Sequence, residues 1–294
     1  MGNMRYVGAF LTTLLVLFLA GCSSAQQMEG IDHDSSPTMG CQPETVTESG
    51  CALAEGENNA DLFGRDYKGV VEIELVSTED VSGFVAIPAA EGKYPGIVMI
   101  HEWWGLNENI QEMAQLLASE GYVVFAVDLY GNVAATSEEA GKLAGAVRGN
   151  QEKATNQLRA AVSYLRTIPE TQGQKLGSMG WCFGGGQSLQ LALSGEPMDA
   201  TVIYYGSVTD NQTQLRQITW PVLGIFAGED TGIPPASVSS FEAALDELGI
   251  ENDITIYPGV GHAFANPSGA RYAPEETKDA WKKTVEFFDE TLKA

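Results

Sequence analysis

The residues whose types suit catalysis are few, since the chain of 294 residues has only four cysteines and three histidines. Cys182 lies in the run Gly180-Trp-Cys-Phe-Gly184, between an apolar stretch typical of a strand and a helical pattern. A strand that turns sharply into a helix is the geometry of a nucleophile elbow, here with Cys where Ser is more usual. Glycines two residues before and after would let strand and helix approach closely. The pattern predicts a sulfur nucleophile at a helix N-terminus, where the helix dipole favours a thiolate.

Two other interpretations of this turn stay open. A glycine-rich connection between strand and helix also occurs in dinucleotide-binding loops, but the glycines 184–186 follow the cysteine and no G-x-G-x-x-G pattern is present. Cys182 would alternatively be a buried structural residue, since free cysteines are often buried.

A thiolate nucleophile needs a base, and His262 is the best placed of the three histidines. It lies in a predicted loop after the last strand pattern and before the C-terminal helix pattern. His33 falls in a polar N-terminal stretch and His101 ends a predicted strand ahead of Cys182. Only His262 satisfies the chain order nucleophile, acid, histidine that accompanies such an elbow. The alternative is a loop histidine without a role.

The acid that orients the histidine must then lie between Cys182 and His262. Asp230, with Glu229 beside it, follows an apolar strand pattern at 222–227. We expect Asp230 to orient the imidazole and stabilise its cation. Asp128 also ends a strand pattern, but it precedes the nucleophile and is interpreted as structural.

Strand and helix patterns alternate from residue 61 onward. Apolar runs at 96–100, 122–127, 175–179, 200–205, 222–227 and 253–257 indicate mostly buried parallel strands, and 70–75 and 83–87 a strand pair with alternating faces. Helical patterns occupy 107–119, 138–147, 151–167, 185–193, 237–248 and 275–291. The alternation predicts one α/β domain at 61–294, with a mostly parallel central sheet and helices on both faces.

The N-terminal region is predicted to direct the protein to its compartment and not to be part of the folded domain. Residues 1–21 carry one base, Arg5, and an apolar run, which is typical of a secretory signal; a retained membrane anchor is the alternative. Residues 22–60 are polar and acidic and predict a flexible linker. Within it, Cys41 and Cys51 are either a disulfide pair of an oxidising compartment or two unpaired thiols.

The four residues that end at Cys22, Leu-Ala-Gly-Cys, resemble a bacterial lipobox. The resemblance implies cleavage before Cys22 and lipidation of its sulfur. Ser23 rather than Asp follows the cysteine, which by analogy favours the outer membrane. We therefore expect a protein of the bacterial cell envelope, held by lipid alone and facing the periplasm.

The charge balance excludes some partners. Sixteen basic against 39 acidic residues give a net charge of −23. Phosphate binding needs clustered Lys and Arg, so nucleic acid is not an expected partner, and anionic lipid would repel the chain. No pattern sets an oligomeric state.

Three blocks together resemble the dienelactone hydrolase family of the α/β-hydrolase fold, over about residues 65–292: His101-Glu-Trp-Trp-Gly105, Gly180-Trp-Cys-Phe-Gly-Gly185 and Gly261-His-Ala-Phe264. The resemblance implies a Cys182–His262–Asp230 triad that hydrolyses a small ester or lactone through a thioester. It also implies that Glu102 contacts the resting thiol and controls its ionisation. The oxyanion hole would come from the backbone N–H groups of Trp103 and Phe183.

The chain departs from this family at two positions. Members of the family hold the substrate carboxylate with arginines, at positions where this chain has Gly131 and Asn266. An arginine clamp is not replaced by Gly or Asn, so we expect a neutral or less acidic ester or lactone instead of dienelactone. Pocket residues are expected among the side chains near these positions, with core packing as the alternative for the aromatic ones: Trp103, Trp104, Tyr130, Gly131, Phe264 and Asn266.

Two other functions compete with the hydrolase. A catalytically silent binding protein on the same fold would carry the same residues, since fold alone does not fix function. A metal-dependent hydrolase is less favoured, because no histidine pair has the spacing of metal ligands. We expect neither a cofactor nor a metal.

Overall fold

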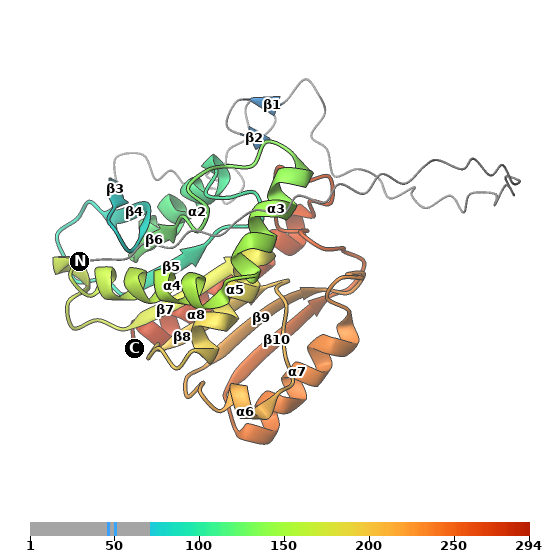
Figure 1. The fold of residues 1–294 in the computed structure, drawn as a ribbon. Helices are drawn as coiled ribbons and strands as arrows, with labels where there is room; N and C mark the ends of the chain where they lie inside the picture. The colour runs from blue at the N-terminus through green and yellow to red at the C-terminus, as the bar shows by residue number, and fades with distance from the viewer. Residues whose placement is uncertain (1–45, 48–49, 52–70) are drawn as a thin grey trace, which may run out of the picture. The chain divides into compact units, whose positions relative to one another are not determined.

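A computed structural model describes residues 46–47, 50–51 and 71–294 (Figure 1). The predicted signal segment, Cys22 and Cys41 lie outside the described residues, as does the boundary predicted at residue 61. Strands β1 (Val46–Thr47) and β2 (Gly50–Cys51) pair antiparallel as a separate two-stranded sheet. This short pair was not predicted, because the polar stretch around it shows no strand periodicity.

Eight strands form the central sheet, in the order β10-β9-β8-β7-β5-β6-β4-β3. They are β3 (Val71–Ser77), β4 (Ser82–Pro88), β5 (Gly96–Ile100), β6 (Val123–Val127), β7 (Leu176–Trp181), β8 (Ala200–Tyr204), β9 (Val222–Ala227) and β10 (Asn252–Tyr257). Strands β5 to β10 are parallel, whereas β4 pairs antiparallel with both β3 and β6. The mostly parallel sheet predicted from the sequence is confirmed.

Helices cover both faces of this sheet (Figure 1). They are α2 (Glu108–Ser119), α3 (Ser137–Arg148), α4 (Gln151–Leu165), α5 (Phe183–Leu193), α6 (Gln212–Leu215), α7 (Pro235–Leu248) and α8 (Pro274–Leu292), with a short 3₁₀ helix at Pro169–Thr171. Side chains of α4, α5 and α7 join one core, which contains Val98 and Phe125, and those of α2 and α8 join the other, which contains Ile97 and Met99. Neighbouring residues of β5 thus face different cores, which is why its whole run is apolar. Among the described helices, none has both the length and the apolarity that a membrane span requires.

The strand pair at the end of the sheet differs from its prediction. Alternating faces were expected for both strands, but β4 is almost wholly buried and β3 is mostly exposed. Strand β4 lies between two neighbours, whereas β3 is the terminal strand of the order. As a result the apolar Ile73 and Leu75 are 53% and 80% exposed. The sequence pattern does not reveal which strand ends a sheet.

The turn from β7 into α5 is possible only because its glycines lack side chains. A Cβ atom on Gly184 would lie 2.2 Å from the Ile100 carbonyl oxygen, and one on Gly180 2.4 Å from the Gly184 backbone. Real Cβ atoms essentially never approach backbone so closely. Helix α5 therefore packs directly on strand β5, as expected from the spacing of these glycines.

We predict that Gly184→Ala destabilises the fold by about 3 kcal/mol or more, because the added methyl group meets rigid backbone. Gly141→Ala is the matched control: Gly141 lies in helix α3, and a Cβ there would have no neighbour within 4 Å. That control should gain about 0.5–1 kcal/mol from helix propensity. Denaturant unfolding of both variants checks this, and equal effects would contradict the close approach.

Candidate active site

Cys182 occupies the turn between β7 and α5 in a backbone conformation that residues other than glycine rarely adopt. Its φ is 54° and its ψ −114°, at the N-cap position of α5. Its N–H donates to the Tyr204 carbonyl at 2.9 Å, and its own carbonyl accepts from the Gly186 N–H. Strain of this kind persists only where the surroundings enforce it, and it concentrates at functional sites. The turn presents a partly exposed sulfur at the N-terminus of a helix.

His262 and Asp230 lie on two neighbouring loops that follow parallel strands. Asp230 comes after β9 and His262 after β10. The loops are joined by backbone hydrogen bonds from Gly228 N–H to the Tyr257 carbonyl (2.7 Å) and from Glu229 N–H to the Val260 carbonyl (2.9 Å). Because the carboxyl ends of parallel strands meet at one edge of a sheet, residues 32 positions apart come into contact.

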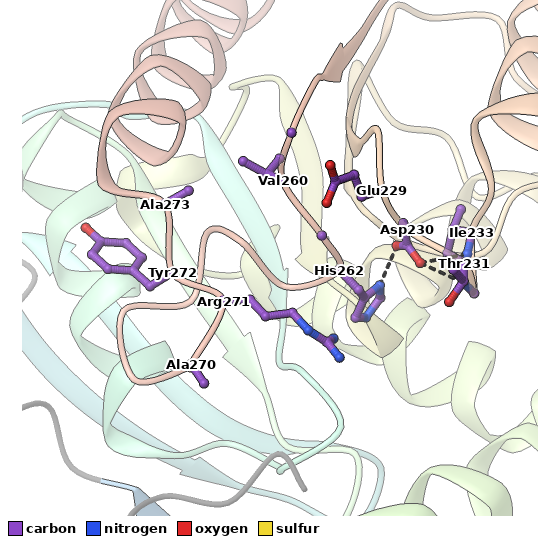
Figure 2. A pocket seen from close by; sticks show the side chains of 13 residues that line it. Glu229, Asp230, Thr231, Ile233, Val260, His262, Ala270, Arg271, Tyr272 and Ala273 are labelled. Carbon is purple, nitrogen blue, oxygen red and sulfur yellow. Dashed lines mark hydrogen bonds and ion pairs between the residues drawn. The ribbon is translucent and has the colours of Figure 1, made fainter. Parts of the chain in front are cut away.

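The three side chains form one continuous hydrogen-bonded chain. His262 Nε2 lies 3.0 Å from Cys182 Sγ, and Nδ1 lies 2.6 Å from Asp230 Oδ2. The second oxygen of Asp230 accepts the N–H groups of Gly232 and Ile233, at 2.8 and 2.9 Å. The carboxylate is thereby fixed, and it fixes the ring in turn (Figure 2). All three residues of the triad expected from the sequence are brought together.

The electrostatics of this chain favour a charged imidazole. Burial alone would lower the pKa of His262, but its hydrogen bonds to Asp230 and Cys182 outweigh burial and raise that pKa to about 10. Burial opposes the charge of Asp230 as well, yet the hydrogen bond from His262 and two backbone N–H groups lower its pKa.

The expected oxyanion donors belong to the start of helix α5 and to the loop after β5. Phe183 is the first residue of α5, so its N–H has no carbonyl partner within the helix. Trp103 lies two residues beyond His101 in the loop after β5, and its indole packs edge-on against that of Trp104 with centroids 5.1 Å apart. No hydrogen bond from the Trp103 N–H is recorded within the described chain.

His101, to which the sequence assigned no role, joins two loops of the site. Its Nε2 accepts the N–H of Leu129, so its Nδ1 carries the proton and donates to the Glu102 carbonyl. Burial lowers the pKa of His101, in keeping with a neutral ring. The imidazole thus holds the loop after β5 against the loop after β6. In that second loop Asp128 accepts the N–H groups of Tyr130 and Gly131, the structural role expected of it.

Among the described residues no hydrogen bond joins the Glu102 carboxyl to the Cys182 thiol, between which a contact was expected. Glu102 is buried, and its carboxyl accepts hydrogen bonds from the Asn266 amide and, at 3.5 Å, from the Tyr205 hydroxyl. Asn266 Oδ1 accepts both the N–H and the hydroxyl of Ser268, so its NH₂ must point at Glu102. Asn266, an uncharged donor, therefore engages the carboxyl.

Tyr205 belongs to the site and was missed. It directly follows β8, has a positive φ of 33° and is fully buried. Its ring packs edge-on against His262 and Phe264, with centroids 5.3 and 5.6 Å away, while its hydroxyl reaches Glu102. The only available signal was its position at the end of a strand next to the elbow strand in space, which sequence order does not reveal.

The expected pocket residues divide into three groups. Phe264 is a correction, because it is fully buried in the core between Tyr205 and Tyr257. Asn266 is also buried and serves Glu102. Trp103, Trp104 and Tyr130 are partly exposed, and Gly131 is exposed with a positive φ of 80°.

A cavity of about 830 Å³ opens on the Asp230 and His262 side of the site (Figure 2). Its lining residues come from the loops after β9 and β10 and include Glu229 and Arg271, whose guanidinium points toward His262 in Figure 2, but not Cys182. Arg271 was not among the residues predicted for the site. Within the described chain no cluster of three or more His, Cys, Asp and Glu side chains is arranged to hold a metal ion.

Known proteins place the chain in a family. The family model described as "Dienelactone hydrolase family" matches residues 81–292. A putative carboxymethylenebutenolidase of Saccharolobus solfataricus is 30% identical over 242 residues, covering 70% of this chain and 93% of that protein. Protein usf of Aquifex pyrophilus is 34% identical over 219 residues, covering 72% of this chain and 94% of that protein.

A solved structure agrees in fold. The crystal structure of a dienelactone hydrolase-like promiscuous phosphotriesterase from metagenomic libraries matches with a TM-score of 0.70 at 22% identity, covering 76% of this chain and all of that one. The sheet order, the helices on both faces and this likeness agree with the α/β-hydrolase fold. With a match over most of its described length, the chain belongs to the dienelactone hydrolase family.

Proposed function

We propose that this hydrolase cleaves carboxylic esters or lactones with Cys182 as its nucleophile. The single observation that carries the proposal is the hydrogen-bonded chain from Cys182 Sγ through His262 to Asp230. A nucleophile within hydrogen-bond reach of a base, itself oriented by a third group, is the arrangement that covalent acyl transfer needs. Membership of a family of ester and lactone hydrolases supports the reaction class.

In the first half-reaction the Cys182 thiolate adds to the substrate carbonyl. The backbone N–H groups of Trp103 and Phe183 stabilise the oxyanion, and each such donor is worth about 3 kcal/mol. When the carbonyl re-forms, the C–O bond to the leaving group breaks and the imidazolium of His262 protonates the departing alkoxide. The product of this step is a thioester on Cys182; with a lactone, the released hydroxyl stays attached to the acyl group.

In the second half-reaction water replaces the leaving group. Neutral His262 takes a proton from the water as it attacks the thioester, and Asp230 stabilises the cation that forms. The C–S bond breaks, the acid leaves and the thiolate is regenerated beside the imidazolium.

The preferred substrate is a neutral or less acidic ester or lactone. Gly131 carries no side chain, and Asn266 is already engaged with Glu102. Neither position therefore supplies a guanidinium for a carboxylate, which weighs against dienelactone itself.

Cys182→Ala should lose roughly 1000-fold or more of kcat on a short-chain para-nitrophenyl ester, because the other triad members act only through the nucleophile. Wild type mixed briefly with the ester should gain the mass of one acyl group on the peptide that contains Cys182. Dienelactone should be a poorer substrate than the neutral ester. Equal activity of wild type and a folded Cys182→Ala protein would refute the proposal, and a strong preference for dienelactone would refute its substrate class.

We propose that Glu102 controls ionisation at the site through charge rather than through contact with the sulfur. Burial raises the pKa of its carboxyl from 4.5 to about 7, while the charge of His262 and hydrogen bonds from Asn266 and Tyr205 moderate the rise. The folded protein therefore keeps a proton that the unfolded chain releases, and stability falls as pH rises from about 4.5 to about 7.

Glu102→Gln should remove this loss of stability at rising pH, because the glutamine amide has the shape of the carboxyl group but does not ionise. Thermal unfolding should show the variant gaining Tm over wild type at about pH 8 and gaining much less at about pH 5. A Tm difference that is the same at both pH values would show that Glu102 does not titrate in this range. Glu74→Gln, at a mostly exposed strand residue, is the control for loss of a carboxylate.

We also propose that the protein is a lipid-anchored component of the bacterial cell envelope. The support is the sequence alone, with the lipobox-like run that ends at Cys22. In a bacterial host, wild type should sediment with outer membranes, whereas Cys22→Ala should lose the lipid mass on its N-terminal peptide and leave that fraction. An unmodified wild-type Cys22 would contradict the proposal.

A further inference from the structure

Among the described residues, one polar atom beside the active site lacks a partner. The hydroxyl oxygen of Tyr130 is buried and forms no hydrogen bond with any group in that part of the chain. A buried donor without a partner costs free energy, and proteins satisfy most such groups. The Tyr130 hydroxyl therefore destabilises the fold without an evident structural benefit.

The ring of Tyr130 packs among residues that shape the site. It lies edge-on to His101, with centroids 4.6 Å apart, and tilted on Phe183 at 5.4 Å. Phe183 directly follows the nucleophile, and His101 holds the loop that carries Trp103. Burial raises the pKa of Tyr130, Arg148 lowers it and a Cys182 thiolate raises it further, so the hydroxyl lies within electrostatic range of both charges.

Arg148 brings a cation to the same place. It is the last residue of α3, and its guanidinium carbon lies 5.6 Å from the centroid of the Phe183 ring. The side chain is exposed, and no salt bridge or hydrogen bond joins it to another residue within the described ranges. In a chain of net charge −23 with 39 acidic residues, a cation without a salt bridge among the described residues, beside the ring that follows the nucleophile, is unusual.

We propose that the Tyr130 hydroxyl and the Arg148 guanidinium form a subsite that binds a second oxygen acceptor of the ester substrate, a carbonyl or a carboxylate. The Tyr130 ring and the Arg148 guanidinium both lie against the ring of Phe183, the residue that follows the nucleophile, so an acyl chain attached to Cys182 would carry its acceptor toward them. Gly131 and Asn266 still supply no cation, so a neutral carbonyl remains the preferred acceptor, and Arg148 is the charged group that a carboxylate would meet. This inference rests on the proposed ester hydrolysis and names the class of acyl group.

Three para-nitrophenyl esters of similar length test the subsite. The pentanoate has no second acceptor, the methyl succinate diester has a neutral one and the succinate monoester has a carboxylate. For Tyr130→Phe, kcat/KM on both succinates, divided by that on the pentanoate, should fall about 10-fold relative to wild type. For Arg148→Gln the ratio should fall for the monoester and change little for the diester. Lys142→Gln, an exposed residue of the same helix, should leave both ratios unchanged.

The Tm of Tyr130→Phe is a second readout. If the hydroxyl had a purely structural role, its removal would lower Tm. Tyr130→Phe removes a hydroxyl without a partner, so its Tm should stay equal to that of wild type or rise. Tyr122→Phe is the matched control, because the Tyr122 hydroxyl donates to Asp289 at 2.7 Å and its loss should lower Tm.

The outcomes separate this inference from the proposed function. If wild type hydrolyses none of the three esters, both fail. If wild type is active but the Tyr130→Phe ratios equal those of wild type, or if the variant loses activity on all three esters equally, the subsite is overturned while ester hydrolysis stands. A fall in the Tm of Tyr130→Phe comparable to that of Tyr122→Phe would likewise overturn it.

Discussion

One imidazole holds the active site together. His262 hydrogen-bonds Cys182 on one nitrogen and Asp230 on the other, and these residues follow strands β7, β9 and β10. These two hydrogen bonds form only if the three strands are parallel and in the observed order. They also require the turn at Cys182 to keep its strained backbone. The glycines at 180 and 184 permit that turn, and the Tyr204 carbonyl holds its N–H. Sheet topology thus sets the chemistry more directly than any single side chain.

A second layer of buried polar groups surrounds this chain at a cost to stability. Glu102 is a buried carboxyl that contacts Asn266 and Tyr205, and its pKa is raised to about 7. Burial makes ionisation of this carboxyl unfavourable, and the charge of His262 and the two hydrogen bonds offset only part of that cost. Natural proteins tolerate such groups where function requires them, and here they gather around one imidazole.

The sequence predicted the elements and the reacting residues because both depend on local patterns. Apolar runs bounded by glycines mark the buried strands, and the order of Cys182, Asp230 and His262 follows from their places at strand ends. Contacts between distant residues were beyond such patterns. Asn266 lies 164 positions from Glu102 in the sequence and Tyr205 lies 103 positions from it, yet both donate hydrogen bonds to its carboxyl. Neither these hydrogen bonds nor the place of Tyr205 in the site was predicted. Phe264 was expected in a pocket and lies in the core, since an aromatic residue beside a catalytic motif suits either place. The exposure of β3 depends on its terminal position, which is a property of the whole sheet.

The most direct test of this account is an NMR titration of the His262 imidazole in the wild-type protein, with His262→Gln used to assign its signals. The account predicts a pKa near the value of about 10 set by Asp230 and Cys182, so that both ring nitrogens still carry protons at about pH 8. Asp230→Asn should lower the pKa of His262. A wild-type imidazole that titrates near the ordinary value of 6.5 would contradict the claim that His262 links nucleophile and acid as a charged group.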